Sequence, residues 1–133
     1  MITAIDHVGI AVPDLDAAVE QYGRAFGIEP AFRERVEDQG VEEALFEVGG
    51  SFIQLVSPLG PDTPVGRFLE KRGPGIHHIG YRVTSVAETL ATFKAEGVRL
   101  IDEEPRIGSM GNTIAFVHPK GMSGVLVELV EER

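Results

Sequence analysis

The chain repeats its own opening sequence just past its midpoint, and this internal repeat constrains the fold more than any other feature. Residues 5–12 read IDHVGIAV, and residues 76–83 read IHHIGYRV. An offset of 71 residues aligns His7 with His78, and it also aligns the glycine that stands two positions after each histidine. We therefore expect two copies of one unit, whose matched histidines contribute to a shared site.

Each copy is expected to fold as strand, helix, strand, strand, strand, which gives an α+β fold class. The predicted elements of the first copy are strands at 2–12, 30–36, 41–48 and 51–57 and a helix at 15–26. Those of the second copy are strands at 76–83, 98–101, 112–118 and 124–131 and a helix at 86–96. A Gly- and Pro-rich connector, 59–74, contains a short predicted helix at 64–72. The chain, 1–133, is thus expected to be one domain made of two repeats, at about 1–58 and 75–133.

The first predicted helix begins after Asp14, a favourable N-cap, and ends at Gly27. Its apolar residues recur at helical spacing, which predicts one buried stripe. That stripe consists of Leu15, Ala18, Val19, Tyr22 and Phe26.

Two glycines, Gly49 and Gly50, predict a two-residue turn that sets the register of the hairpin 41–57. With that register, Leu45 lies opposite Gln54, and Glu43 lies opposite Val56. One face of the hairpin is then apolar throughout and should pack under the helix. It carries Ala44, Phe46, Val48, Ile53 and Leu55. Glu43 and Gln54 are expected on the other face.

Each copy offers one polar residue on its first strand and one on its last. These are His7 with Gln54 in the first copy and His78 with Glu128 in the second. A single histidine on a strand is more often a hydrogen-bonded core residue, but four positions that match in pairs favour a metal site. Nitrogen and oxygen donors suit Co²⁺, Mn²⁺, Ni²⁺, Fe²⁺ or Zn²⁺, and the sequence does not choose among these ions.

The two remaining histidines are predicted differently. His77 has the opposite parity to His78 on the same strand, so we interpret it as structural. His118 stands at a strand end before Pro119, where either a structural or a functional role is open.

Composition excludes several classes of partner. The formal net charge of −9 argues against nucleic acid and anionic membranes, so an anionic small ligand would need a local basic patch or a bound cation. No apolar run is long enough to span a membrane, and the first residues lack the pattern of a secretory signal. The chain has no cysteine, which fits a reducing cytoplasm.

Beyond the first strand, several longer motifs carry a family resemblance. They are residues 6–12, 38–41, 75–79, 104–108 and 116–121, followed by 124–129. With these motifs and the repeated β-α-β-β-β unit, the sequence resembles the vicinal oxygen chelate superfamily. Within it, the sequence is similar to the methylmalonyl-CoA epimerase family over essentially its whole length.

The resemblance implies an open, barrel-like cup around a divalent metal, with Co²⁺ favoured and His7, Gln54, His78 and Glu128 as ligands. It implies epimerisation of methylmalonyl-CoA at C2, by a 1,1-proton transfer through a metal-stabilised enolate. Glu43 and Glu128 are then the expected proton-transfer pair, and the protein is expected to be a homodimer. The choice between methylmalonyl-CoA and ethylmalonyl-CoA, and the residues that bind the CoA phosphates, stay open.

Two other functions fit the same fold. One is a glyoxalase-type lyase or isomerase, which would act on a hemithioacetal with the same metal ligands. The other is a non-enzymatic module that sequesters a ligand in an aromatic groove. The second is disfavoured because the chain has no Trp and only two tyrosines, Tyr22 and Tyr81.

Overall fold

The computed structural model describes residues 1–132, which form eight strands and three α-helices. The first series is β1 (Ile2–Ala11), α1 (Leu15–Phe26), β2 (Phe32–Val36), β3 (Val41–Val48) and β4 (Ser51–Pro58). After α2 (Pro64–Arg72) the second series is β5 (Gly75–Val83), α3 (Val86–Ala95), β6 (Arg106–Ile107), β7 (Thr113–Val117) and β8 (Val127–Glu131). The α+β class is confirmed, and the order β-α-β-β-β occurs twice. None of the three α-helices, the longest of which has 12 residues, is long and apolar enough to cross a membrane.

The chain divides into two compact units, and the boundaries fall inside strands β1 and β5. One unit is Val8–His77, and the other joins Met1–His7 to the chain from His78 onward. The first has the strand order β2-β3-β4-β1, and the second has the order β1-β5-β8-β7-β6. In the second unit β5 pairs with β8 in parallel, and β7 pairs with β8 antiparallel.

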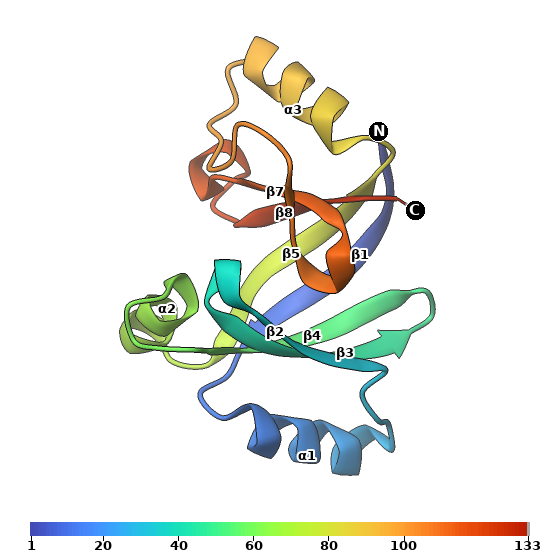
Figure 1. Ribbon diagram of the computed structural model, residues 1–133, viewed down its shortest axis with the longest axis vertical. Coiled ribbons are helices and arrows are strands. Elements are labelled where there is room, and N and C mark those ends of the chain that lie inside the picture. The colour runs from blue at the N-terminus through green and yellow to red at the C-terminus, as the bar shows by residue number, and fades with distance from the viewer. Residues whose placement is uncertain (133) are drawn as a thin grey trace. The chain divides into compact units, whose positions relative to one another are not determined.

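In the unit Val8–His77, helix α1 packs on one face of the β3–β4 hairpin (Figure 1). The hairpin register is as predicted, with Leu45 opposite Gln54 and Glu43 opposite Val56. The core beneath α1 combines the helix stripe with the apolar hairpin face. Its members are Val12, Leu15, Ala18, Ala44, Phe46 and Leu55, with Ile10, Val19, Tyr22, Ile28 and Ile53 packed against them.

Two residues predicted in this core are exposed. Phe26 is 66% exposed and Val48 is 51% exposed. Each is the last residue of its element: Phe26 precedes the left-handed Gly27, and Val48 precedes the Gly49-Gly50 turn. At these ends the helix and the hairpin have no opposing element to cover the side chain.

In the other unit, helix α3 begins after Ser85, whose side chain accepts from the Glu88 backbone N–H, and packs on the sheet. The core under α3 consists of Val83, Val86, Leu90, Ala115, Val117, Val127 and Leu129, with Tyr81, Phe93, Val98, Leu100 and Met122 around it. This core fixes strands β5, β7 and β8 against one helix, and two of those strands carry residues of the site.

Two predicted strands of the second series are wrong in extent. At 98–101 there is only an isolated bridge from Leu100 to Val117, because the backbone N–H groups of Ile101 and Asp102 both donate to the Phe116 carbonyl. A regular ladder cannot form on a shared acceptor, and the two-residue β6 pairs with β7 instead. Strand β8 begins at Val127 and not at 124, since Gly124 has a φ of 88°, outside the extended region.

Candidate functional site

Three of the predicted ligands lie together in the unit formed by Met1–His7 and the chain from His78 onward. His7 comes from β1, His78 from β5 and Glu128 from β8, and their exposed fractions are 3%, 4% and 2%. Gly80 lies opposite Glu128 in the parallel β5–β8 pair. Because alternate residues of a strand share a face, His78 and Glu128 point to the same side of the sheet.

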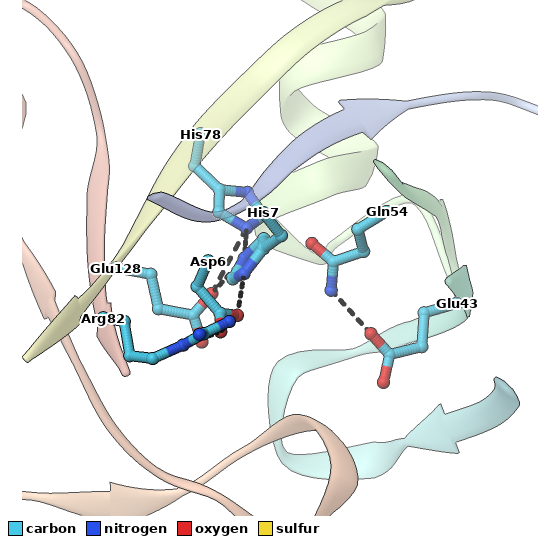
Figure 2. Close-up of polar contacts among 7 residues, drawn as sticks. All are labelled: Asp6, His7, Glu43, Gln54, His78, Arg82 and Glu128. Carbon is cyan, nitrogen blue, oxygen red and sulfur yellow. Dashed lines mark hydrogen bonds and ion pairs between the residues drawn. The ribbon is translucent and has the colours of Figure 1, made fainter. Parts of the chain in front are cut away.

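The three side chains converge on one point (Figure 2). The Nε2 atoms of His7 and His78 are 3.0 Å apart, and Glu128 Oε1 lies 3.0 Å from the first and 3.2 Å from the second. Within residues 1–132, these three form the group of His, Asp and Glu side chains able to hold a metal ion. Two imidazole nitrogens and one carboxylate oxygen are suitable donors for a divalent first-row metal, so the residues fit such an ion.

His7 has a charged partner on its other ring nitrogen. Its Nδ1 lies 2.8 Å from Asp6 Oδ2, and Arg82 donates to the other oxygen of the same carboxylate from Nε and Nη2, at 3.0 and 2.9 Å. We did not predict Asp6 or Arg82 as site residues. The only indication in the sequence was that both residues lie in the repeated segments. Asp6 immediately precedes His7, and Arg82 stands four residues after His78.

His78 has an aromatic neighbour. The Phe116 ring meets the His78 ring edge-on, with centroids 6.0 Å apart. The Arg106 guanidinium stands 5.4 Å from the Phe116 centroid on the ring's face, and Arg106 Nε is 3.2 Å from Asp102 Oδ2. Packing therefore restrains His78.

The three groups of the triad have shifted pKa values. Burial lowers the pKa of His7, but the hydrogen bonds and charges of Asp6 and Glu128 outweigh it and raise that pKa to about 9. Burial lowers the pKa of His78, and the nearby His7 lowers it further. Burial raises the pKa of Glu128, but hydrogen bonds from both histidines bring it well below its usual range. Without a metal, the triad thus holds a carboxylate beside a protonated His7.

The other two predicted site residues lie together in the unit Val8–His77. Glu43 on β3 and Gln54 on β4 have exposed fractions of 0% and 2%. The Gln54 Nε2 donates to Glu43 Oε1 at 2.5 Å (Figure 2). Within the described part of the chain, the buried Gln54 Oε1 has no hydrogen-bond partner. A buried acceptor of this kind is expected to have a ligand, because leaving a buried oxygen without a hydrogen bond or a ligand costs free energy.

The remaining histidines have local structural contacts. The His77 ring meets the Phe68 ring edge-on at 5.0 Å, in agreement with its predicted structural role. His118 accepts a hydrogen bond from the Lys120 backbone N–H through Nδ1, at 3.0 Å, and so caps the short helix Pro119–Gly121.

With the fold and the triad described, comparison with known proteins identifies the class. The profile of the Glyoxalase/Bleomycin resistance protein/Dioxygenase superfamily matches residues 6–116. The chain belongs to this superfamily.

Several of its relatives are methylmalonyl-CoA epimerases. The chain is 40% identical over 131 residues to the ethylmalonyl-CoA/methylmalonyl-CoA epimerase of Cereibacter sphaeroides, covering 97% of this chain and 98% of that protein. It is 44% identical to a solved methylmalonyl-CoA epimerase in complex with methylmalonyl-CoA and NH₄⁺, with a TM-score of 0.96, covering 99% of this chain and 96% of that one. It is 43% identical to a variant of the Streptomyces coelicolor methylmalonyl-CoA epimerase in complex with 2-nitronate-propionyl-CoA, with the same TM-score and coverage. The resemblance predicted from the sequence is confirmed.

Proposed function

We propose that this chain is a metal-dependent epimerase that interconverts the R and S forms of methylmalonyl-CoA at C2. The observation that carries the proposal is the buried triad of His7, His78 and Glu128, in a chain several of whose relatives are named for this reaction. A triad of this composition suits an ion that stays bound through turnover, because neutral nitrogen and anionic oxygen donors are both supplied by rigid strands.

The chemistry requires removal of a proton that lies between a thioester carbonyl and a carboxylate. When bound, a divalent ion at the triad would supply Lewis-acid stabilisation for the enolate that forms. The Streptomyces relative binds 2-nitronate-propionyl-CoA, and a nitronate is planar and negatively charged like an enolate. That ligand supports an enolate in the proposed reaction.

We assign Gln54 as the fourth ligand, through Oε1. Two observations support this. The repeat matches Gln54 with Glu128, and Gln54 Oε1 is buried without a hydrogen-bond partner in the described chain while Nε2 is held by Glu43. Donation from Nε2 to Glu43 fixes the amide so that its oxygen is available to an ion.

Glu43 is proposed to remove the C2 proton. It is fully buried, its Oε1 accepts from a neutral amide, and a carboxylate of this kind can accept a proton from carbon when substrate excludes water. Inversion through a planar enolate also needs an acid on the second face. Glu128 is the second group in the proposal, and for this role its carboxylate must first take up a proton.

Further features of the proposed enzyme come from the resemblance and the composition. Co²⁺ is the proposed ion, and Mn²⁺, Ni²⁺, Zn²⁺ and Fe²⁺ use the same donors. The proposed assembly is a homodimer, each chain being one domain of two repeats at about 1–58 and 75–133. The proposed location is the cytoplasm, which the absence of cysteine fits.

The test is exchange of the C2 proton in deuterated buffer, with and without a chelator. We expect deuterium to enter methylmalonyl-CoA only in the metal-loaded protein, with ethylmalonyl-CoA run in parallel to rank the two substrates. A folded, metal-loaded protein that exchanges neither substrate contradicts the proposal. If it converts a methylglyoxal–glutathione adduct instead, the glyoxalase alternative is correct.

A further inference from the structure

The two matched histidines differ in what surrounds them, and His7 has the more elaborate support. One carboxylate oxygen of Asp6 lies 2.8 Å from His7 Nδ1. When that oxygen accepts a hydrogen bond from Nδ1–H, the lone pair of the neutral ring is on Nε2, the atom that faces His78 and Glu128. The tautomer of His7 is thus set by its neighbour in the sequence.

Asp6 is itself fixed from the neighbouring strand. Arg82 donates twice to Oδ1, from Nε and from Nη2, which leaves Oδ2 for His7. The Asp6 and Arg82 side chains are 13% and 28% exposed, so water competes little for the carboxylate. A two-pronged contact from a planar guanidinium restrains both the position and the plane of a carboxylate.

Gly80 provides the space for the His7 ring. A Cβ atom at this position would lie 2.2 Å from His7 Cε1, 2.4 Å from Nδ1 and 2.8 Å from Nε2. These separations are shorter than non-bonded contacts allow, so any side chain at residue 80 would displace the imidazole from the triad.

We infer that Asp6, Arg82 and Gly80 act together as a positioning device for His7, which orients its Nε2 for metal binding. The inference rests on the proposed metal site. None of the three is proposed to touch substrate; they act through His7 alone.

The sequence repeat indicates that the device serves only one of the two histidines. The residue that matches Asp6 in the second copy is His77, and the residue that matches Arg82 in the first is Ala11. Neither can supply a carboxylate or a guanidinium. His7 is thus supported by Asp6 and, through it, by Arg82, while His78 packs against the Phe116 ring.

The test measures Co²⁺ binding to the full chain by calorimetry and by the visible absorption spectrum of the bound ion. For Asp6→Asn we expect affinity to fall about 10- to 100-fold, the usual cost of losing an outer partner of a metal ligand. Arg82→Met should weaken binding by less, and Arg82→Lys, which keeps one charged contact, by less again. Gly80→Ala should weaken binding at least as much as Asp6→Asn and change the spectrum.

Asp16→Asn is the matched control, because Asp16 also forms an ion pair with an arginine, but at an exposed site. In that pair Asp16 Oδ1 lies 2.6 Å from Arg33 Nη2. It should bind Co²⁺ as the wild type does. If Asp6 and Arg82 serve only the fold, their variants will melt at lower temperature without metal yet bind Co²⁺ with unchanged affinity and spectrum, which overturns the inference. A folded wild-type chain that binds no Co²⁺ overturns the metal site itself, so the two failures are distinct.

Discussion

Each compact unit contains one fully enclosed glutamate, and the two have different neighbours. Glu128 lies between the imidazoles of His7 and His78, with its Oε1 3.0 and 3.2 Å from their Nε2 atoms. Glu43 instead accepts a hydrogen bond from the amide of Gln54. Glu128 Oε1 thus lies beside two titratable imidazoles, whereas the Gln54 amide that donates to Glu43 is neutral.

The strand registers show that this difference is built into the repeat. Gln54 lies opposite Leu45, and Glu128 lies opposite Phe116, so Leu45 and Phe116 occupy matched positions. Two residues earlier, Glu43 then matches Ile114, which is 1% exposed and apolar. The second copy offers a ligand but no counterpart of Glu43. The comparison supports the proposal that both copies contribute metal ligands, and it shows that a buried carboxylate at the position of Glu43 occurs only in the first copy.

The largest effect is expected from Glu128→Gln. The change keeps the shape of the side chain but removes the negative charge that both imidazoles contact. Metal affinity should fall by more than about 100-fold, because loss of an outer partner alone costs 10- to 100-fold. Epimerisation should fall to background with it. Metal content after dialysis, measured with deuterium exchange on the same sample, checks both; a variant that keeps its metal would show that Glu128 is not a ligand.

Glu43→Gln should separate the two functions. Metal content should stay that of the wild type, while deuterium exchange at C2 falls about 10²- to 10⁴-fold, the range expected for loss of a general base. Glu47→Gln is the control, since Glu47 lies on the same strand but is exposed near the turn. If Glu43→Gln exchanges the C2 proton at the wild-type rate with wild-type metal content, Glu43 takes no part in the reaction. The difference between the surroundings of Glu43 and Glu128 would then have no functional consequence.

Gln54→Ala tests whether Gln54 is a metal ligand. Loss of the unpartnered oxygen should weaken Co²⁺ binding about 10- to 100-fold if Oε1 is a ligand. The control is Gln39→Ala, because Gln39 also has a buried amide atom without a partner, but that atom is the donor Nε2, which cannot bind a cation. Equal Co²⁺ affinities in the two variants and the wild type would restrict the ligand set to His7, His78 and Glu128.

The sequence predicted the central parts of this comparison because local geometry decides them. Strand parity and the repeat bring His7, His78 and Glu128 to one point, and a two-residue turn fixes Glu43 relative to Gln54. Both arguments use short-range periodicity, which a sequence reports directly. For the same reason the split between His77 and His78 was predictable.

The contacts that escaped prediction depend on pairings between distant strands. Arg82 reaches Asp6 across 76 residues, and this requires the register of β1 against β5, which no turn determines. The strand predicted at 98–101 was wrong for the same reason. The Ile101 and Asp102 backbone N–H groups both donate to the Phe116 carbonyl, and this depends on where β7 lies. Phe26 has the spacing of a core residue, but periodicity does not report where the opposing hairpin ends.

The last prediction concerns pH, and it also distinguishes the two glutamates. The pKa of His7 is raised from 6.5 to about 9 by Asp6 and Glu128, so the metal-free triad holds a proton below about pH 9 that an incoming ion must displace. Co²⁺ affinity should therefore rise about tenfold per pH unit below about pH 9 and level off above it.

Binding near pH 8 should release close to one proton, measurable by calorimetry in buffers of different ionisation enthalpy. Glu43→Gln should leave this profile unchanged, because Asp6 and Glu128, and not Glu43, are the groups that raise the pKa of His7. In Asp6→Asn the pKa of His7 should be lower, because one of the two groups that raise it has lost its charge. The Co²⁺ affinity should then level off at a lower pH. A profile that shifts in Glu43→Gln and not in Asp6→Asn would mean that Glu43, and not Asp6, sets the pKa of His7, and the different roles assigned to Glu43 and Glu128 would have to be abandoned.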